Sequence, residues 1–153
     1  SMNPYADPES PAWAPLLEAA WAARSRAHAP YSRFHVGAAL AFADGSVVAG
    51  CNVENAAYPL CTCAERVAAC SAVAQGRQHP VALVVVTEAD RLTPPCGACR
   101  QVLVEFADRL PILLANGRAK ALHRLEELLP EAFTPRDLGI VPVSVQSKPG
   151  SVD

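Results

Sequence analysis

The chain has 153 residues, of which 51% are hydrophobic and 18% are charged. This length fits one domain, and the composition allows a buried core, so an intrinsically disordered chain is excluded. The net charge of −2, without a run of Lys or Arg, argues against a nucleic-acid groove and for a small substrate. No apolar stretch reaches the roughly 18 residues of a transmembrane helix, so we expect no membrane span.

The two ends of the chain are expected to lie outside its folded part. Residues 1–10 are polar and lack the charged and apolar regions of a signal peptide. We expect them to be a flexible N-terminus in which Ser1 and Met2 remain from a tag. Residues 11–139 are expected to form the single domain, and residues 140–153 a loose tail. Six cysteines without a secretory signal indicate the reducing cytoplasm, where clustered cysteines more often bind metals than form disulfides.

The first predicted elements are a helix and a hairpin. Ser10 followed by Pro11 is typical of a helix start, and an apolar stripe continues to about Ala27. Two strands follow, over residues 36–42 and 46–50. The Asp-Gly pair between them indicates a tight turn, and therefore a β-hairpin.

A second helix is predicted to begin at a cysteine. Cys63, Val67, Cys70 and Ala74 repeat at helical spacing, after an irregular segment. Gly76 is a plausible C-terminal stop. The first thiol would therefore lie at a helix N-terminus.

The second half of the chain alternates strands and helices. The continuous apolar run of residues 81–86 predicts a strand that is covered on both faces. A proline-rich loop at 93–95 precedes helical spacing at 102–106. A strand at 112–115 and a short helix at 125–129 follow. This order predicts a three-layer α/β/α domain with a mixed sheet, in which the two cysteine-bearing helices begin at one edge of the sheet.

The cysteine pattern predicts a zinc site. Cys96 and Cys99 form a C-x-x-C pair, and Cys63 lies at the start of a predicted helix, as Cys96 does. Three thiolates and one open position are typical of a catalytic zinc ion. The alternative is a closed structural site in which Cys61 is the fourth ligand.

Neighbouring residues would tune such a site. The positive end of each helix dipole favours the thiolate form of a cysteine. Arg66 can donate a hydrogen bond to a sulfur, and Arg100 is a second candidate. Cys51 and Cys70 are expected to be small buried side chains rather than ligands.

Glu65 is the candidate acid–base group. It lies two residues after Cys63, so both side chains can reach one metal-bound water only if Cys63 is at the very start of the helix. In that arrangement a buried Glu can take a proton from the water and deliver it to a leaving group. The alternative is a first-turn acid that faces solvent and is favoured by the helix dipole.

Five segments, in order, resemble the small homotetrameric cytidine deaminases, whose class binds zinc through cysteines and uses a non-ligand Glu. The resemblance extends from about Pro15 to Leu138. It implies the three-layer fold with a five-stranded mixed sheet, one Zn²⁺ per subunit, a nucleoside substrate and a homotetramer. The segments are Tyr31–Phe34 with Val36–Ala39, Gly50–Tyr58, Cys63–Arg66, Pro95–Gln101 and Leu128–Phe133.

The resemblance also implies roles for individual residues. Cys63, Cys96 and Cys99 would hold zinc, Glu65 would be the catalytic proton carrier, and Arg66 would donate to the thiolates. On the substrate side, Asn52 and Glu54 would bind the ribose hydroxyls, which suits an amide donor and a carboxylate acceptor. The remaining implied contacts are Phe34 near sugar and base, the Ala64 backbone at the pyrimidine carbonyl, and Tyr58 and Phe133 reaching into a neighbouring subunit's site.

The implied activity is hydrolysis of cytidine and deoxycytidine to uridine and deoxyuridine, with release of ammonia. One alternative is a deaminase of the blasticidin type, against which the ribose pair Asn52 and Glu54 argues. Another is a zinc-stabilised interaction module without enzyme activity. A third is a deaminase that edits RNA or DNA, which the acidic charge balance disfavours.

Overall fold

A mixed sheet forms the centre of the computed structural model, which describes residues 2–142. The strand order is β2-β1-β3-β4-β5. The pair β3 and β4 is parallel, and the other neighbours are antiparallel. The predicted five-stranded mixed sheet is therefore confirmed. The strands are β1 (Gly37–Phe42), β2 (Val47–Cys51), β3 (Pro80–Val86), β4 (Pro111–Ala115) and β5 (Lys120–Arg124).

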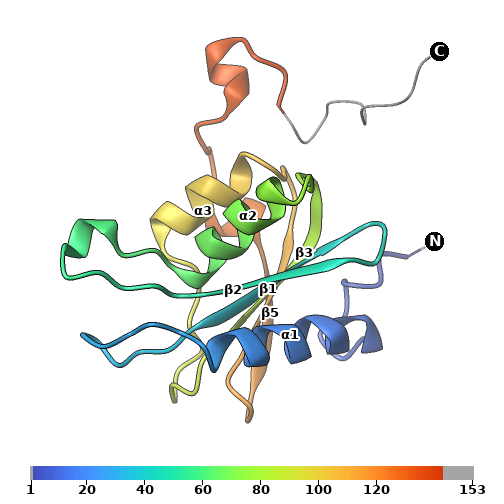
Figure 1. Ribbon diagram of the computed structural model, residues 1–153. Coiled ribbons are helices and arrows are strands. Elements are labelled where there is room, and N and C mark those ends of the chain that lie inside the picture. Colours follow the sequence, from blue (N-terminus) through green and yellow to red (C-terminus); the bar gives the residue numbers. More distant parts are fainter. Residues whose placement is uncertain (1, 143–153) are drawn as a thin grey trace.

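Helices cover both faces of the sheet, which confirms the three layers. Helix α1 (Ala14–Arg24) packs on one face, and α2 (Ala64–Ala74) and α3 (Gly97–Val104) pack on the other (Figure 1). None of the helices in the described part of the chain is long and apolar enough to cross a membrane. The shorter elements are η1 (Pro11–Trp13), η2 (Tyr58–Leu60), α4 (Leu125–Leu128) and η3 (Pro135–Leu138).

The central strand β3 is buried from both sides, as its continuous apolar run predicts. Val84 and Val86 face α1 and pack with Trp13, whereas Leu83 and Val85 face α2 and α3. All of these side chains are fully buried. Burial on both faces removes the alternation of polar and apolar residues that a half-exposed strand shows.

Two glycines allow the helices to lie close to the sheet. A Cβ atom at Gly37 would lie 1.9 Å from the Ala20 carbonyl oxygen of α1. A Cβ atom at Gly50 would lie 2.5 Å from the Ala68 nitrogen and 2.6 Å from the Ala64 oxygen of α2. Because these neighbours are backbone atoms, a larger residue would displace a whole helix.

Strand β5 is the element that the residue pattern alone did not locate. It pairs antiparallel with β4 through the Asn116–Gly117 turn. Its ends, Lys120 and Arg124, are exposed and its middle is only partly buried. A charged edge strand of this kind lacks the apolar signal on which the prediction depends.

The face that α2 buries differs from the predicted stripe. Its buried residues are Ala64, Glu65, Ala68, Ala69 and Ala72. Cys70 is exposed, so its predicted burial is wrong, and Cys51 is half-buried. The alanines of α2 lie on several sides of the helix, so spacing alone identifies the helix but not its inward face.

The N-terminal segment makes specific contacts with the domain. The ring of Tyr5 packs edge-on against Trp13, with centroids 4.9 Å apart. The Trp13 indole N–H donates to the Asp7 carbonyl at 3.0 Å. At the other end, most of the expected tail, residues 143–153, lies outside the described residues.

Candidate metal centre and active site

The two cysteine-bearing helices begin on the same side of the molecule. Cys63 is the N-cap of α2 and Cys96 is the N-cap of α3, and both have extended backbone angles. In Figure 1 these helix starts lie on the left, beside the loops over residues 27–36 and 52–62. Each of these two thiols therefore lies at the positive end of a helix dipole, which favours the thiolate form.

Three sulfur atoms converge at this point. The Sγ atoms of Cys63, Cys96 and Cys99 all lie within 4.8 Å of one another. The Cys63–Cys96 distance is 3.9 Å and the Cys96–Cys99 distance is 3.5 Å. A tetrahedral zinc ion with Zn–S bonds of about 2.3 Å requires sulfurs about 3.8 Å apart. The three thiols therefore fit a zinc ion.

Cys61 is not part of this group. Within residues 2–142, no further His, Cys, Asp or Glu joins the three mutually close sulfurs. The Cys61 sulfur instead accepts a hydrogen bond from the Asn55 N–H at 3.3 Å. This arrangement favours a site that keeps one position open over a closed four-sulfur site.

Glu65 is buried in the first turn of α2, with 4% of its surface exposed. The pKa of its carboxyl group is raised to about 7, chiefly by burial and to a smaller extent by the nearby Cys63. The Cys99 thiol donates a hydrogen bond that acts in the opposite direction. The carboxyl group therefore lies beside the sulfur cluster and not in solvent, and near pH 7 it can both accept and donate a proton.

The two candidate arginines have different partners. The Arg66 Nη2 atom donates to the Cys63 sulfur at 3.5 Å. The pKa of the Cys63 thiol is lowered to about 5, chiefly by a hydrogen bond with Cys99, and Arg66 contributes to this shift. Arg100 instead donates to the carbonyl oxygens of Pro95 and Leu128, each at 2.8 Å. Arg100 thus links α3 to the end of α4 and is no sulfur donor in this structure.

Asn52 and Glu54 both contact the segment over residues 31–36. The Asn52 side chain accepts from the Val36 N–H at 2.8 Å and donates to the Phe34 carbonyl at 2.7 Å. Glu54 accepts from the backbone N–H groups of Tyr31 and Ser32, at 3.0 and 3.1 Å. A cavity of about 290 Å³ lies beside this carboxylate and is lined by Tyr31, Ser32, Glu54, Tyr58 and Cys61.

Three predicted aromatic contacts are exposed in the single chain. Phe34 is 42%, Tyr58 66% and Phe133 59% exposed. Tyr58 touches Tyr31 edge-on, with ring centroids 5.6 Å apart. Phe133 lies in the orange-red segment after α4, which projects away from the layers in Figure 1. Ala64, by contrast, is fully buried at the start of α2.

The sequence patterns missed an amide that fixes the loop before Cys96. Asn116 is buried, and its Nδ2 atom donates to the carbonyl oxygens of Ala89 and Asp90 at 3.0 and 3.3 Å. Its Oδ1 atom accepts from two N–H groups of its own turn. An Asn before a Gly is a common turn signal, so nothing in the pattern indicated a second role.

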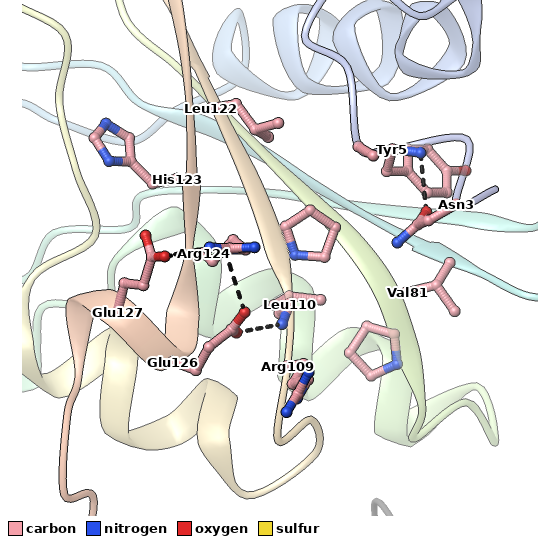
Figure 2. A pocket seen from close by; sticks show the side chains of 13 residues that line it. Asn3, Tyr5, Val81, Arg109, Leu110, Leu122, His123, Arg124, Glu126 and Glu127 are labelled. Atoms are coloured by element: carbon pink, nitrogen blue, oxygen red, sulfur yellow. Dashed lines mark hydrogen bonds and ion pairs between the residues drawn. The ribbon is translucent and has the colours of Figure 1, made fainter.

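A larger cavity, of about 640 Å³, lies at the opposite end of the sheet. It is bordered by the starts of β3 and β4 and the end of β5, whereas the cysteines follow the end of β3. Figure 2 shows that three of its charged groups are paired with one another: Arg124 contacts Glu126 and Glu127, and Glu126 also accepts from the Leu110 N–H. It offers no group of close metal ligands.

Comparisons with known proteins agree with this geometry. Residues 14–114 match the model of the cytidine and deoxycytidylate deaminase zinc-binding region. The cytidine deaminase of Halalkalibacterium halodurans is 47% identical over 125 residues, which are 80% of this chain and 95% of that protein.

Two solved structures are similar over nearly their whole length. The cytidine deaminase of Burkholderia pseudomallei has a TM-score of 0.75 and 49% identity, over 78% of this chain and 98% of that one. The cytidine deaminase of Mycobacterium tuberculosis has a TM-score of 0.69 and 43% identity, over 79% and 96%.

The chain is therefore a zinc-binding deaminase by fold and by donor set. It belongs to the cytidine and deoxycytidylate deaminase family, as the sequence resemblance indicates. The cluster of Cys63, Cys96 and Cys99 is the part of this domain that suits the metal.

Proposed function

We propose that this chain hydrolyses cytidine and deoxycytidine to uridine and deoxyuridine, with release of ammonia. The observation that carries the proposal is the buried Glu65 carboxyl group, with a pKa of about 7, beside three thiols that fit zinc. Family membership and the names of the similar proteins support the same reaction.

The reaction needs a nucleophile and a proton carrier. Zinc, when bound by the three cysteines, lowers the pKa of a water molecule so that it can attack carbon 4 of the base. Glu65 would accept the first proton that this water loses and deliver it to N3 of the ring. It would then take the remaining proton from the new hydroxyl group on carbon 4 and deliver it to the amino group. The bond between carbon 4 and that nitrogen breaks, ammonia leaves, and a carbonyl group remains on carbon 4. Arg66 withdraws charge from Cys63 and so offsets the electron-rich donor set.

The substrate is held by groups around the cavity beside Glu54. In this proposal Glu54 and Asn52 bind the ribose hydroxyls, and the Ala64 backbone meets the pyrimidine carbonyl. Phe34 packs near sugar and base. The Glu54 carboxylate has about four lone-pair sites, of which the segment over residues 31–36 uses three, so one remains for a hydroxyl group.

The assembly is proposed to be a homotetramer in which Tyr58 and Phe133 complete a neighbouring subunit's site. Support comes from their exposure and from that of Leu138 and Ile140 in the same C-terminal segment, at 65% and 55%. A covering subunit would exclude water and strengthen the polar contacts with substrate. The six unpaired cysteines suit the reducing cytoplasm as its location.

A purified-protein assay separates this proposal from its alternatives. The absorbance of cytidine should fall as ammonia is released, and a zinc chelator should abolish the change. A non-enzymatic zinc module would release no ammonia. A blasticidin-type enzyme would turn over its aminated antibiotic faster than cytidine, and an editing enzyme would require a polynucleotide.

A further inference from the structure

The segment over residues 31–36 is held in place largely by side chains. It carries Phe34 and borders the cavity beside Glu54. Its backbone makes few hydrogen bonds with other backbone groups. The Arg33 N–H donates to the Ala29 carbonyl at 2.9 Å, and the Val36 carbonyl accepts from the Asn52 N–H at 3.3 Å. The other ties to the neighbouring chain segment run through the side chains of Asn52 and Glu54.

Ser32 takes part in several of these hydrogen bonds. Its hydroxyl group is hydrogen-bonded to the Glu54 Oε2 atom. The Ser32 hydroxyl oxygen also accepts a hydrogen bond from the Phe34 N–H at 3.0 Å. The Ser32 N–H donates to Oε1 of the Glu54 carboxylate. One small side chain thus links the carboxylate to the backbone of the aromatic residue.

Arg33, between Ser32 and Phe34, adopts an unfavourable backbone conformation. Arg33 has a φ angle of +58°, in the left-handed region that residues other than glycine rarely adopt. Such a conformation persists only where surrounding contacts hold it. The Ser32 hydroxyl group, from the residue before Arg33, contacts Glu54 and the backbone of Phe34, the residue after Arg33.

We propose that Ser32 is a positioning residue for the sugar-binding half of the site, because its hydroxyl group holds the Glu54 carboxylate and Phe34 in one arrangement. This inference rests on the proposed function, in which Glu54 binds ribose. The pKa of Glu54 is lowered, chiefly by its hydrogen bond with Ser32, and His28 lowers it slightly. The charged carboxylate that a ribose hydroxyl would meet is thus the form that Ser32 favours.

The effect should appear in binding and not in chemistry. Ser32 and Glu54 belong to a different part of the chain from the cluster of Cys63, Cys96 and Cys99. A loosened carboxylate would weaken contacts that the bound substrate and the transition state share, which raises KM and leaves kcat unchanged.

The test compares variants at one position. Ser32→Ala should raise KM for cytidine about tenfold, keep kcat within a factor of about two and retain full zinc. Ser32→Thr, which keeps the hydroxyl group on an exposed side chain, should restore KM to within about a factor of two of the unaltered chain. Ser25→Ala is the matched control, because this exposed serine donates only to the Ala22 carbonyl at the end of α1.

Inhibition gives a second readout. Inhibition by uridine should weaken in parallel with KM in Ser32→Ala, whereas inhibition by uracil, which has no ribose, should not change.

Should Ser32→Ala fail to fold, Ser32→Cys removes the same oxygen, and its KM must rise in the same way. An unchanged KM in the variant that lacks the oxygen, or equal losses in Ser32→Ala and Ser32→Thr, would overturn the inference. Absence of cytidine turnover in the unaltered chain would instead overturn the proposed function.

Discussion

At the scale of single residues, the site combines groups whose protonation the fold has altered. Cys63 lies at a helix N-terminus and beside Arg66, and the pKa of its thiol is lowered to about 5. Glu65, two residues later, is buried and has a pKa of about 7. Adjacent groups whose pKa values move in opposite directions can divide the roles of metal ligand and proton carrier between them.

Glu65→Gln tests the proton carrier. Gln has a similar shape but cannot exchange a proton, so kcat for cytidine should fall by about 10²–10⁴. Zinc content, measured by atomic absorption, should remain the same as in the unaltered chain, because Glu65 lies outside the sulfur group. A kcat within a few-fold of the original value would rule out the proposed role.

Cys99→Ala tests the ligand set. Loss of one of three thiolates should lower the bound zinc well below one ion per chain and abolish turnover. Cys61→Ala is the matched comparison and should retain zinc, because the Cys61 sulfur contacts Asn55 and not the cluster. The opposite result, with zinc lost only in Cys61→Ala, would assign the site to the other sulfur.

At the scale of elements, the site depends on how closely α2 approaches the sheet. Gly50 of β2 faces the backbone of Ala64, which lies between Cys63 and Glu65, and of Ala68, one turn later. The two helices whose starts carry the sulfurs follow different strands: α2 comes after the hairpin of β1 and β2, and α3 comes after β3. Their relative position, and not either motif alone, sets the distances from the Cys63 sulfur to the sulfurs of Cys96 and Cys99.

Gly50→Ala is expected to move α2. The added methyl group would lie 2.5 Å from a backbone nitrogen, which no side-chain rotation can relieve. Overpacking of this kind costs about 1–3 kcal/mol, so the urea midpoint should fall and zinc affinity should fall with it. Gly97→Ala provides the stability control, because its methyl group would meet nothing within 4 Å. Equal midpoints for the two variants would contradict the packing argument.

At the scale of the whole molecule, several large apolar side chains remain exposed on the single chain. Tyr58, which lines the cavity beside Glu54, and Leu60 are each 66% exposed, and Leu138 and Ile140 are exposed in the C-terminal segment. Exposed large apolar side chains of this kind are typical of an interface between subunits.

Sedimentation velocity should therefore show a species of four 16.1 kDa chains. The double variant Leu138→Asp and Ile140→Asp should shift the protein to smaller species, because charges in an apolar contact are costly to bury. Its turnover should fall in proportion to dissociation. A fully active monomer at assay dilution would exclude Tyr58 and Phe133 from the working site.

The sequence by itself determined the chemistry and most of the elements. The spacing of Cys63, Cys96 and Cys99 predicted a zinc site, because ligand type and spacing can be read from the sequence. The resemblance of five segments to cytidine deaminases implied the hydrolytic reaction and the role of Glu65. The apolar run of β3 and the hairpin of β1 and β2 were equally local signals.

Only the tertiary structure decided which neighbours these residues meet. It excluded Cys61 from the sulfur group, turned Arg100 toward carbonyl groups, exposed Cys70 and linked Ser32 to Glu54. It also showed that the charged segment Lys120–Arg124 is an edge strand. These outcomes depend on contacts between segments distant along the chain and on which side of a helix is buried, and neither is encoded in the spacing of residues within one segment.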